Sequence, residues 1–168
     1  MRFELEKEIK KIVRGYKLIE VKPEEIDDAV NGKNGLNLNW LEAHKTAEII
    51  NELNPDKAIV DCPSINIKRY KEYLLDLLNN KDIELIVEHR AEKYYPVAAS
   101  SILGKCARER QVLELKKKYG NIGSGYPSDP STQKFLKENG KKYPEIFRKS
   151  WSTWKKLYDK KQKKLDEF

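Results

Sequence analysis

Apolar residues along the chain recur at two different spacings, and these predict both helices and strands. Helical spacing predicts helices over five segments, which are 3–14, a short one from Pro23, 39–53, 67–78 and 97–120. Short apolar runs predict strands over 16–21, 58–61 and 83–89. From residue 39 to residue 120 the order is helix, strand, helix, strand, helix. That order favours an α/β fold with parallel strands.

The last part of the chain is predicted to be a helix that begins near Lys149. Its three aromatic residues would share one face, namely Trp151, Trp154 and Tyr158. Near the other end, Asp27 and Asp28 fall within the short helix after Pro23, and we expect both carboxylates on the surface.

Composition indicates one soluble domain in a reducing compartment. The chain has 168 residues, of which 36% are charged, and no apolar run could span a bilayer. The first residues, "MRFELEKEIKK", are charged from the start, so we predict no signal peptide and a cytoplasmic location. Cys62 and Cys106 lack metal-ligand spacing and are predicted to be reduced core residues. With only two histidines, a His-rich metal site is excluded.

The positive charge is concentrated at the end of the chain. The formal net charge is +7, and residues 141–168 hold ten Lys or Arg against four Asp or Glu, a net of +6. A basic terminal segment is typical of a polyanion partner, most often nucleic acid. A solvated helix surface explains the same charge, and both interpretations stay open.

Two carboxylates follow the predicted strands. Asp61 ends the run "AIVD", and Glu92 lies three residues beyond "IVEH". The carboxyl ends of neighbouring parallel strands share one rim, where α/β proteins bind ligands. Paired carboxylates without histidine suit Mg²⁺ or Mn²⁺. The alternative is that Asp61 caps the next helix and Glu92 is solvated.

The stretch "GSGYPSDP", residues 123–130, predicts a rigid loop that presents Tyr126. Its glycines, Gly123 and Gly125, allow close approach of another chain, and its prolines stiffen the backbone. A tight surface turn with a packed tyrosine is the alternative.

Three stretches together resemble archaeal ribonuclease HII. They are "EHRAEKYYPVAASSILGKCARER" (88–110), "YGNIGSGYPSDPSTQKFL" (119–136) and "FRKSWST" (147–153). The resemblance implies an RNase H-like α/β fold, a mixed sheet flanked by helices, with a C-terminal helical segment. It also implies an endonuclease that hydrolyses the RNA strand of RNA/DNA hybrids and nicks DNA at embedded ribonucleotides. In this family four carboxylates hold two divalent ions.

By this resemblance, Asp61 matches the third carboxylate, on the leaving-group side, and Glu92 matches the fourth, beside the ion that activates water. Tyr126 matches the tyrosine that stacks on the sugar beside the RNA–DNA junction, with Gly123, Ser124 and Gly125 next to the strand. Four cationic side chains are predicted to contact phosphates, namely Lys105, Arg108, Arg148 and Lys149.

The chain departs from the family pattern in three ways. It has no D-E-A-G-x-G strand, which carries the first two carboxylates, so we expect missing N-terminal strands and either a fragment or one half of a split enzyme. The fourth carboxylate is Glu92 in "RAE" where "KAD" is usual, although ribonuclease HIII has Glu there. The stretch "PVAASSILGK" is one residue shorter than usual, with Gly104 where Ala is common. We predict an incomplete catalytic domain over 1–148, an aromatic and basic helix over 149–161 and a tail over 162–168.

The chain ends "QKKLDEF", which resembles the short motif that binds the sliding clamp PCNA. Gln162, Leu165 and Phe168 fall at its first, fourth and seventh positions. Leu165 and Phe168 would fill an apolar pocket from one helical turn. A frayed tail with a single Phe is the alternative.

The leading hypothesis is therefore a ribonuclease HII polypeptide that is inactive alone and active once a D-E-A-G-x-G segment is added. A second hypothesis is a clamp-tethered module that binds RNA/DNA hybrids without catalysis. A third is a decayed gene product that does not fold.

Overall fold

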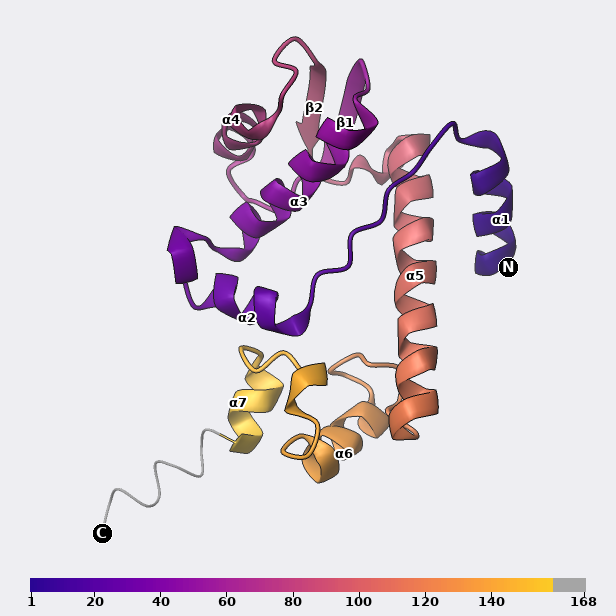
Figure 1. Ribbon diagram of the computed structural model, residues 1–168, viewed down its shortest axis with the longest axis vertical. Helices are drawn as coiled ribbons and strands as arrows, with labels where there is room; N and C mark the ends of the chain where they lie inside the picture. The colour runs from indigo at the N-terminus through magenta and orange to yellow at the C-terminus, as the bar shows by residue number, and fades with distance from the viewer. Residues whose placement is uncertain (159–168) are drawn as a thin grey trace. The chain divides into compact units, whose positions relative to one another are not determined.

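The computed structural model describes residues 1–158 (Figure 1). The α-helices of this part are α1 (Arg2–Ile12), α2 (Pro23–Val30), α3 (Leu38–Leu53), α4 (Ile67–Leu77), α5 (Tyr95–Tyr119), α6 (Pro130–Asn139) and α7 (Ser152–Tyr158). The strands are β1 (Lys57–Asp61) and β2 (Glu84–Glu88), and short 3-10 turns are η1 (Lys33–Gly35), η2 (Ala91–Lys93) and η3 (Pro144–Ile146). The predicted α/β class is confirmed.

The chain packs as two compact units. Unit 1 comprises residues 1–20 and 36–108, and unit 2 comprises residues 21–35 and 109–168. The predicted division at residues 148 and 161 stays a prediction.

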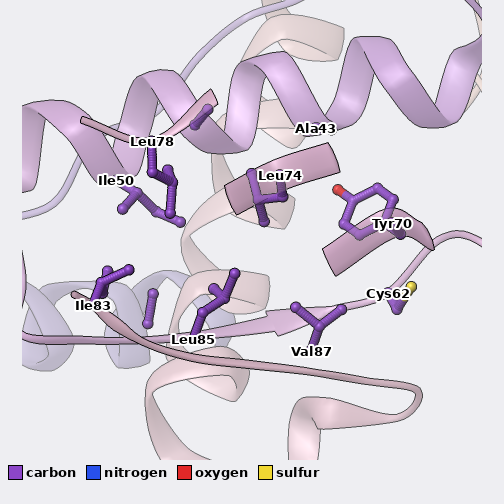
Figure 2. Packing of buried hydrophobic residues seen from close by; sticks show 11 residues of the cluster. Ala43, Ile50, Cys62, Tyr70, Leu74, Leu78, Ile83, Leu85 and Val87 are labelled. Atoms are coloured by element: carbon purple, nitrogen blue, oxygen red, sulfur yellow. The ribbon is translucent and has the colours of Figure 1, made fainter. Parts of the chain in front are cut away.

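Unit 1 is built on a parallel pair of strands, as the order of elements predicts. The register pairs Lys57 with Glu84 at one end and Asp61 with Glu88 at the other. The helices α3 and α4 pack against each other, and α4 also packs on β2. Figure 2 shows the resulting core, in which Leu74 of α4 lies between α3 and the strand residues Leu85 and Val87. Leu74 is fully buried, so this core fixes the strands whose carboxyl ends carry the acidic residues.

The predicted strand over 16–21 is wrong. Residues 16–22 form an irregular segment that pairs with neither described strand. The β-branched and aromatic residues there favour extended backbone, but a strand also requires a partner, which local sequence does not reveal. The segment is held instead by Lys17, which forms ion pairs with Glu48, at 3.5 Å, and with Glu52 on α3.

Unit 2 is held together by aromatic packing around α6 and α7. The Phe147 and Trp154 ring centroids lie 5.9 Å apart, and those of Trp154 and Tyr158 lie 4.6 Å apart. The Tyr158 hydroxyl donates to the Leu136 carbonyl at 2.7 Å. The predicted aromatic helix is thus present, but α7 begins at Ser152, and Trp151 lies in the turn before it.

Candidate functional site

The carboxyl end of the sheet in unit 1 brings acidic residues together. Asp61 and Glu88 are register partners at the last position of their strands. The Cys62 N–H donates to the Glu88 carbonyl at 3.0 Å, which keeps the two strands paired at this end. The Asp61 side chain, however, lies at the exposed rim.

A sharp turn returns the chain to Asp61 after β2. Arg90 has a left-handed backbone with a φ of 55°, and η2 follows it. The Asp61 carboxylate accepts a hydrogen bond from the Ala91 N–H at 3.3 Å, and Ala91 is fully buried. Glu92 comes next in the chain and is exposed. The structure therefore brings Asp61 to the backbone directly before Glu92.

Glu88 is an acidic residue of this rim that sequence reasoning missed. Its carboxylate forms an ion pair with Lys93 and accepts a hydrogen bond from the Tyr94 hydroxyl at 2.7 Å. Lys93 first, and Tyr94 second, lower the pKa of Glu88 below its usual value. The sequence does contain a signal for Glu88. It lies near the end of the run "IVEH", and in two parallel strands that position is level with Asp61. Glu88 is thus ionised and already engaged by neighbours.

Asp61 and Glu92 are suited to part of a metal site. Both are exposed and offer the oxygen ligands that Mg²⁺ and Mn²⁺ prefer. Within residues 1–158, however, no three His, Cys, Asp or Glu side chains are grouped so that they could hold a metal ion. The donor chemistry fits divalent ions, but these two carboxylates are too few to enclose a pair of them.

The 123–130 loop of unit 2 is tied to the start of α6. The Ser124 N–H donates to the Asp129 carboxylate at 2.6 Å. The Gly125 N–H donates to the Thr132 hydroxyl at 3.0 Å, and that hydroxyl donates to the Ile122 carbonyl, also at 3.0 Å. These bonds tie the loop backbone to the first turn of α6.

Asp129 is the centre of this network and was not predicted from the sequence. It is the N-cap of α6, where its carboxylate accepts from the Ser131 N–H at 2.8 Å. Hydrogen bonds from Ser124, then from Ser131, lower the pKa of Asp129 to about 2. An Asp directly before Pro130 is a recognised helix-start signal, so the sequence did contain this information.

Gly123 is required by packing within the loop. Its φ is +70°, and a Cβ there would lie 2.6 Å from the Thr132 backbone nitrogen and 2.8 Å from the Asp129 carboxylate. The prediction that this glycine lets a nucleic-acid strand approach is a separate matter and stays a prediction. Tyr126 is 52% exposed on the same loop.

Residues 148–151 form a turn in unit 2 that is held by Asp27 of α2. The Asp27 carboxylate accepts from the Lys149 N–H at 2.7 Å, the Ser150 N–H at 3.0 Å and the Ser150 hydroxyl at 2.6 Å. Burial alone would raise the pKa of Asp27, but these bonds and the Arg148 charge outweigh burial and lower it. Asp27 is only 9% exposed, so the prediction that it lies on the surface is wrong.

A groove of about 130 Å³ lies between the loop and the turn. Gly125 and Pro127, which flank Tyr126 in the sequence, line it from the loop. Arg148, Trp151 and Trp154 line it from the turn and α7. Pro127 is also anchored through its carbonyl, which accepts from the Gln133 amide at 2.7 Å. The turn and the loop therefore form one continuous surface within unit 2.

The remaining predicted contact residues lie in different places. Lys105 is exposed on α5 and Arg108 is half-buried on the same helix, both within unit 1. Lys149 is exposed on the turn of unit 2. The predicted clamp-binding residues Gln162, Leu165 and Phe168 lie outside the described residues. No helix within residues 1–158 has the length and apolar character needed to cross a membrane.

Comparison with known proteins shows the family. Residues 1–154 match the model of the family described as ribonuclease HII. A ribonuclease HII of Thermococcus sibiricus is 40% identical over 172 residues, which cover 99% of this chain and 74% of the relative. That of Pyrococcus furiosus is 39% identical, over 96% of this chain and 74% of its own length.

Solved structures agree with the sequence comparison. The ribonuclease H2 from Pyrococcus horikoshii OT3 is similar with a TM-score of 0.83 and 36% identity, over 96% of this chain and 77% of that chain. A chain in the PCNA:RNase HII complex from Archaeoglobus fulgidus is similar with a TM-score of 0.78 and 38% identity, over 90% of this chain and 73% of that one. The fold is thus that of an RNase H-like α/β protein. Within that class, the chain belongs to the ribonuclease HII family.

Proposed function

We propose that this protein acts as a ribonuclease HII, hydrolysing the RNA strand of RNA/DNA hybrids and nicking DNA at embedded ribonucleotides. The observation that carries the proposal is the hydrogen bond from the Ala91 N–H to Asp61. It brings a strand-end carboxylate to the backbone directly before Glu92, in a chain that belongs to this family. Acidic residues at the carboxyl ends of parallel strands are where α/β enzymes bind ligands.

Asp61 and Glu92 are the residues that would hold divalent ions, either Mg²⁺ or Mn²⁺. When bound, such ions supply an activated water and stabilise the charge on the leaving oxygen. Following the family pattern, Asp61 serves the leaving-group side and Glu92 the side of the attacking water. Glu92 is longer than the usual Asp by about 1.5 Å, roughly one bond length, and its exposed position leaves room to accommodate that length.

The metal site is completed by a segment that carries the D-E-A-G-x-G strand. The scarcity of grouped ligands in residues 1–158 supports this requirement. The described sheet supports it as well, because β1 and β2 pair only with each other. A two-stranded sheet leaves edges at which a further strand can pair.

Tyr126 and four cationic residues bind the substrate in this proposal. Tyr126 stacks on the sugar beside the RNA–DNA junction, and its exposure is compatible with that contact. Side chains on α5 and on the 148–151 turn contact the phosphates, namely Lys105, Arg108, Arg148 and Lys149.

We also propose that the tail residues Gln162, Leu165 and Phe168 bind the sliding clamp PCNA in the cytoplasm. The similar chain from Archaeoglobus fulgidus was solved in a PCNA:RNase HII complex, which supports this partner. Phe168→Ala should weaken clamp binding by at least about tenfold, since buried aromatic anchors dominate such contacts. Calorimetric titration of PCNA with both proteins checks this, and equal affinities would argue against it.

Metal titration tests the catalytic proposal directly. The protein reconstituted with a D-E-A-G-x-G segment should bind Mn²⁺, and Asp61→Asn should remove most of that binding. The competing hypothesis is an inactive, clamp-tethered module that binds hybrids. Retained hybrid binding with no Mn²⁺ binding in the reconstituted protein would favour that module over the enzyme.

A further inference from the structure

Asp27 is a buried carboxylate with no part in the proposed metal site. Its oxygens accept three hydrogen bonds that join α2 to the 148–151 turn. Hydrogen bonds to an ionised carboxylate are about twice as strong as neutral ones. Two of the three donors are backbone N–H groups, so Asp27 fixes the path of the turn itself. The Lys149 side chain remains exposed.

The turn that Asp27 holds carries the charged and aromatic groups of one groove wall. The Arg148 guanidinium lies 4.3 Å from the centroid of the Trp151 ring, and both residues line the groove. The opposite wall includes Gly125 and Pro127, on either side of Tyr126. Asp27 therefore sets the position of the Arg148 wall relative to the Tyr126 loop, entirely within unit 2.

Two neighbouring cations, on a turn that shares a groove with the loop of the exposed Tyr126, suit the backbone of a nucleic-acid strand. Contacts to phosphates fix the register of a protein on a duplex, whereas they carry little sequence information. Such contacts depend on where the cations are held. A turn that lost three hydrogen bonds to Asp27 would spread Arg148 and Lys149 over many positions, which costs conformational entropy on binding.

We propose that Asp27 is a positioning residue for substrate binding. By holding the 148–151 turn against α2, it presents Arg148 and Lys149 to phosphates of the strand that the Tyr126 loop contacts. Asp27 itself touches no substrate. The inference rests on the proposed function for the identity of the substrate, but it concerns binding and not cleavage.

The test compares Asp27→Asn and Asp27→Ala with a matched control, Asp28→Asn. Asp28 is the next residue of the same helix, and it pairs with Lys33 at 2.8 Å, away from the turn. Fluorescence anisotropy would measure binding of the whole chain to duplex DNA with one ribonucleotide, at several salt concentrations. All proteins would be studied well below their melting temperatures.

The expected readout is the dependence of affinity on salt, which a purely stabilising residue would not change. Each lost phosphate contact makes the slope of log affinity against log salt shallower by about 0.9. Loss of both contacts makes this slope shallower by about 1.8. The ratio of the wild-type affinity to the Asp27→Ala affinity therefore falls roughly tenfold between about 50 and about 200 mM salt. Asp28→Asn should keep the wild-type slope.

Ser150→Ala provides a milder variant if Asp27→Ala fails to fold. It removes only the hydroxyl bond to Asp27 and should shift the slope in the same direction by less. Wild-type slopes in the folded Asp27 and Ser150 variants, with lowered melting temperatures, would overturn the proposal. A wild-type chain that does not bind the duplex would overturn it as well. If the Asp27 variants change the salt slope but the reconstituted wild-type protein does not cleave, the positioning role of Asp27 is upheld and the catalytic proposal is refuted.

Discussion

The acidic rim of unit 1 and the loop-and-turn surface of unit 2 are built in opposite ways. At the rim, Asp61 accepts one long hydrogen bond of 3.3 Å from the Ala91 N–H, and Glu92, the next residue in the chain, is exposed. In unit 2, Asp129 and Asp27 each accept several short bonds and have lowered pKa values. One set of carboxylates is available for ligands, and the other is used to hold backbone.

This difference separates recognition from chemistry within the chain. The hydrogen bonds described for the loop and the turn join residues of unit 2. The rim has too few grouped ligands among residues 1–158 to hold metal ions by itself. Substrate binding should therefore tolerate changes at the rim, and cleavage should not.

The largest expected effect is at the rim. Asp61→Asn in the reconstituted protein should lower the cleavage rate by roughly a hundredfold or more, because it removes a charged metal ligand. Duplex binding should change by less than about twofold, since Asp61 is not among the residues proposed to contact the duplex, namely Tyr126, Lys105, Arg108, Arg148 and Lys149. Single-turnover cleavage and anisotropy measure the two quantities separately.

Glu84→Gln is the control for that variant. Glu84 lies at the opposite end of β2, where it pairs with Lys57 at 2.6 Å, so it should leave cleavage unchanged. An Asp61→Asn protein that still cleaves at the Glu84→Gln rate would show that the rim is not the catalytic site.

The next largest effect should come from Gly123→Ala. Because the new Cβ would meet the Thr132 backbone at 2.6 Å with φ at +70°, we expect unit 2 to lose about 3 kcal/mol of stability. Urea unfolding followed by Trp151 and Trp154 fluorescence, in a Trp40→Phe background, reports on unit 2.

Gly120→Ala is the matched control, because Gly120 has a φ of +86° but nothing within 4 Å of its Cβ position. It should cost only about 1 kcal/mol, which is the penalty for a Cβ in left-handed backbone. Equal losses in the two variants would mean that backbone strain alone, and not packing on Thr132, fixes the loop.

A smaller effect is expected from Tyr126. Tyr126→Ala should weaken duplex binding about tenfold, or about 1.4 kcal/mol, because it removes the ring that packs on the sugar. Tyr126→Phe keeps the ring and should bind like wild type. Anisotropy titration compares the three proteins, and a Phe variant as weak as the Ala variant would assign the contact to the hydroxyl group.

The smallest expected effect is an acid sensitivity confined to unit 2. Because Asp129 has a pKa of about 2 in the folded state, against an ordinary 3.8, its ionised form stabilises the folded loop. That contribution is complete above about pH 4 and is lost as the pH falls toward 2. Trp151 and Trp154 fluorescence between these values should show the loss, and Asp129→Asn should abolish this part of the pH dependence.

The sequence predicted the elements whose signals are local. The helices α3 to α5 and the two strands are indicated by the spacing of apolar residues within each segment. Their predicted bounds lie within a few residues of the observed ones. The N-cap signal of Asp129 was equally local and was overlooked. The predicted strand over 16–21 failed because pairing depends on a partner elsewhere in the chain.

Asp27 could not be placed from its neighbours in the sequence. Its hydrogen-bond partners lie 122 and 123 residues later, and a helical Asp beside Asp28 has the pattern of a solvated pair. The position of Asp61 at the sheet rim was predictable, because the carboxyl ends of parallel strands meet. Glu88 shares that rim, but its engagement by Lys93 and Tyr94 depends on the turn at Arg90, which periodicity does not show.

The most direct test of the account is a cleavage assay on duplex DNA carrying one ribonucleotide, with Mg²⁺ or Mn²⁺. It would be run with and without a coexpressed segment that carries the D-E-A-G-x-G strand. The account predicts cleavage only when the segment is present, with duplex binding in both cases. Cleavage by this chain alone, at a rate that the segment does not raise, would contradict it.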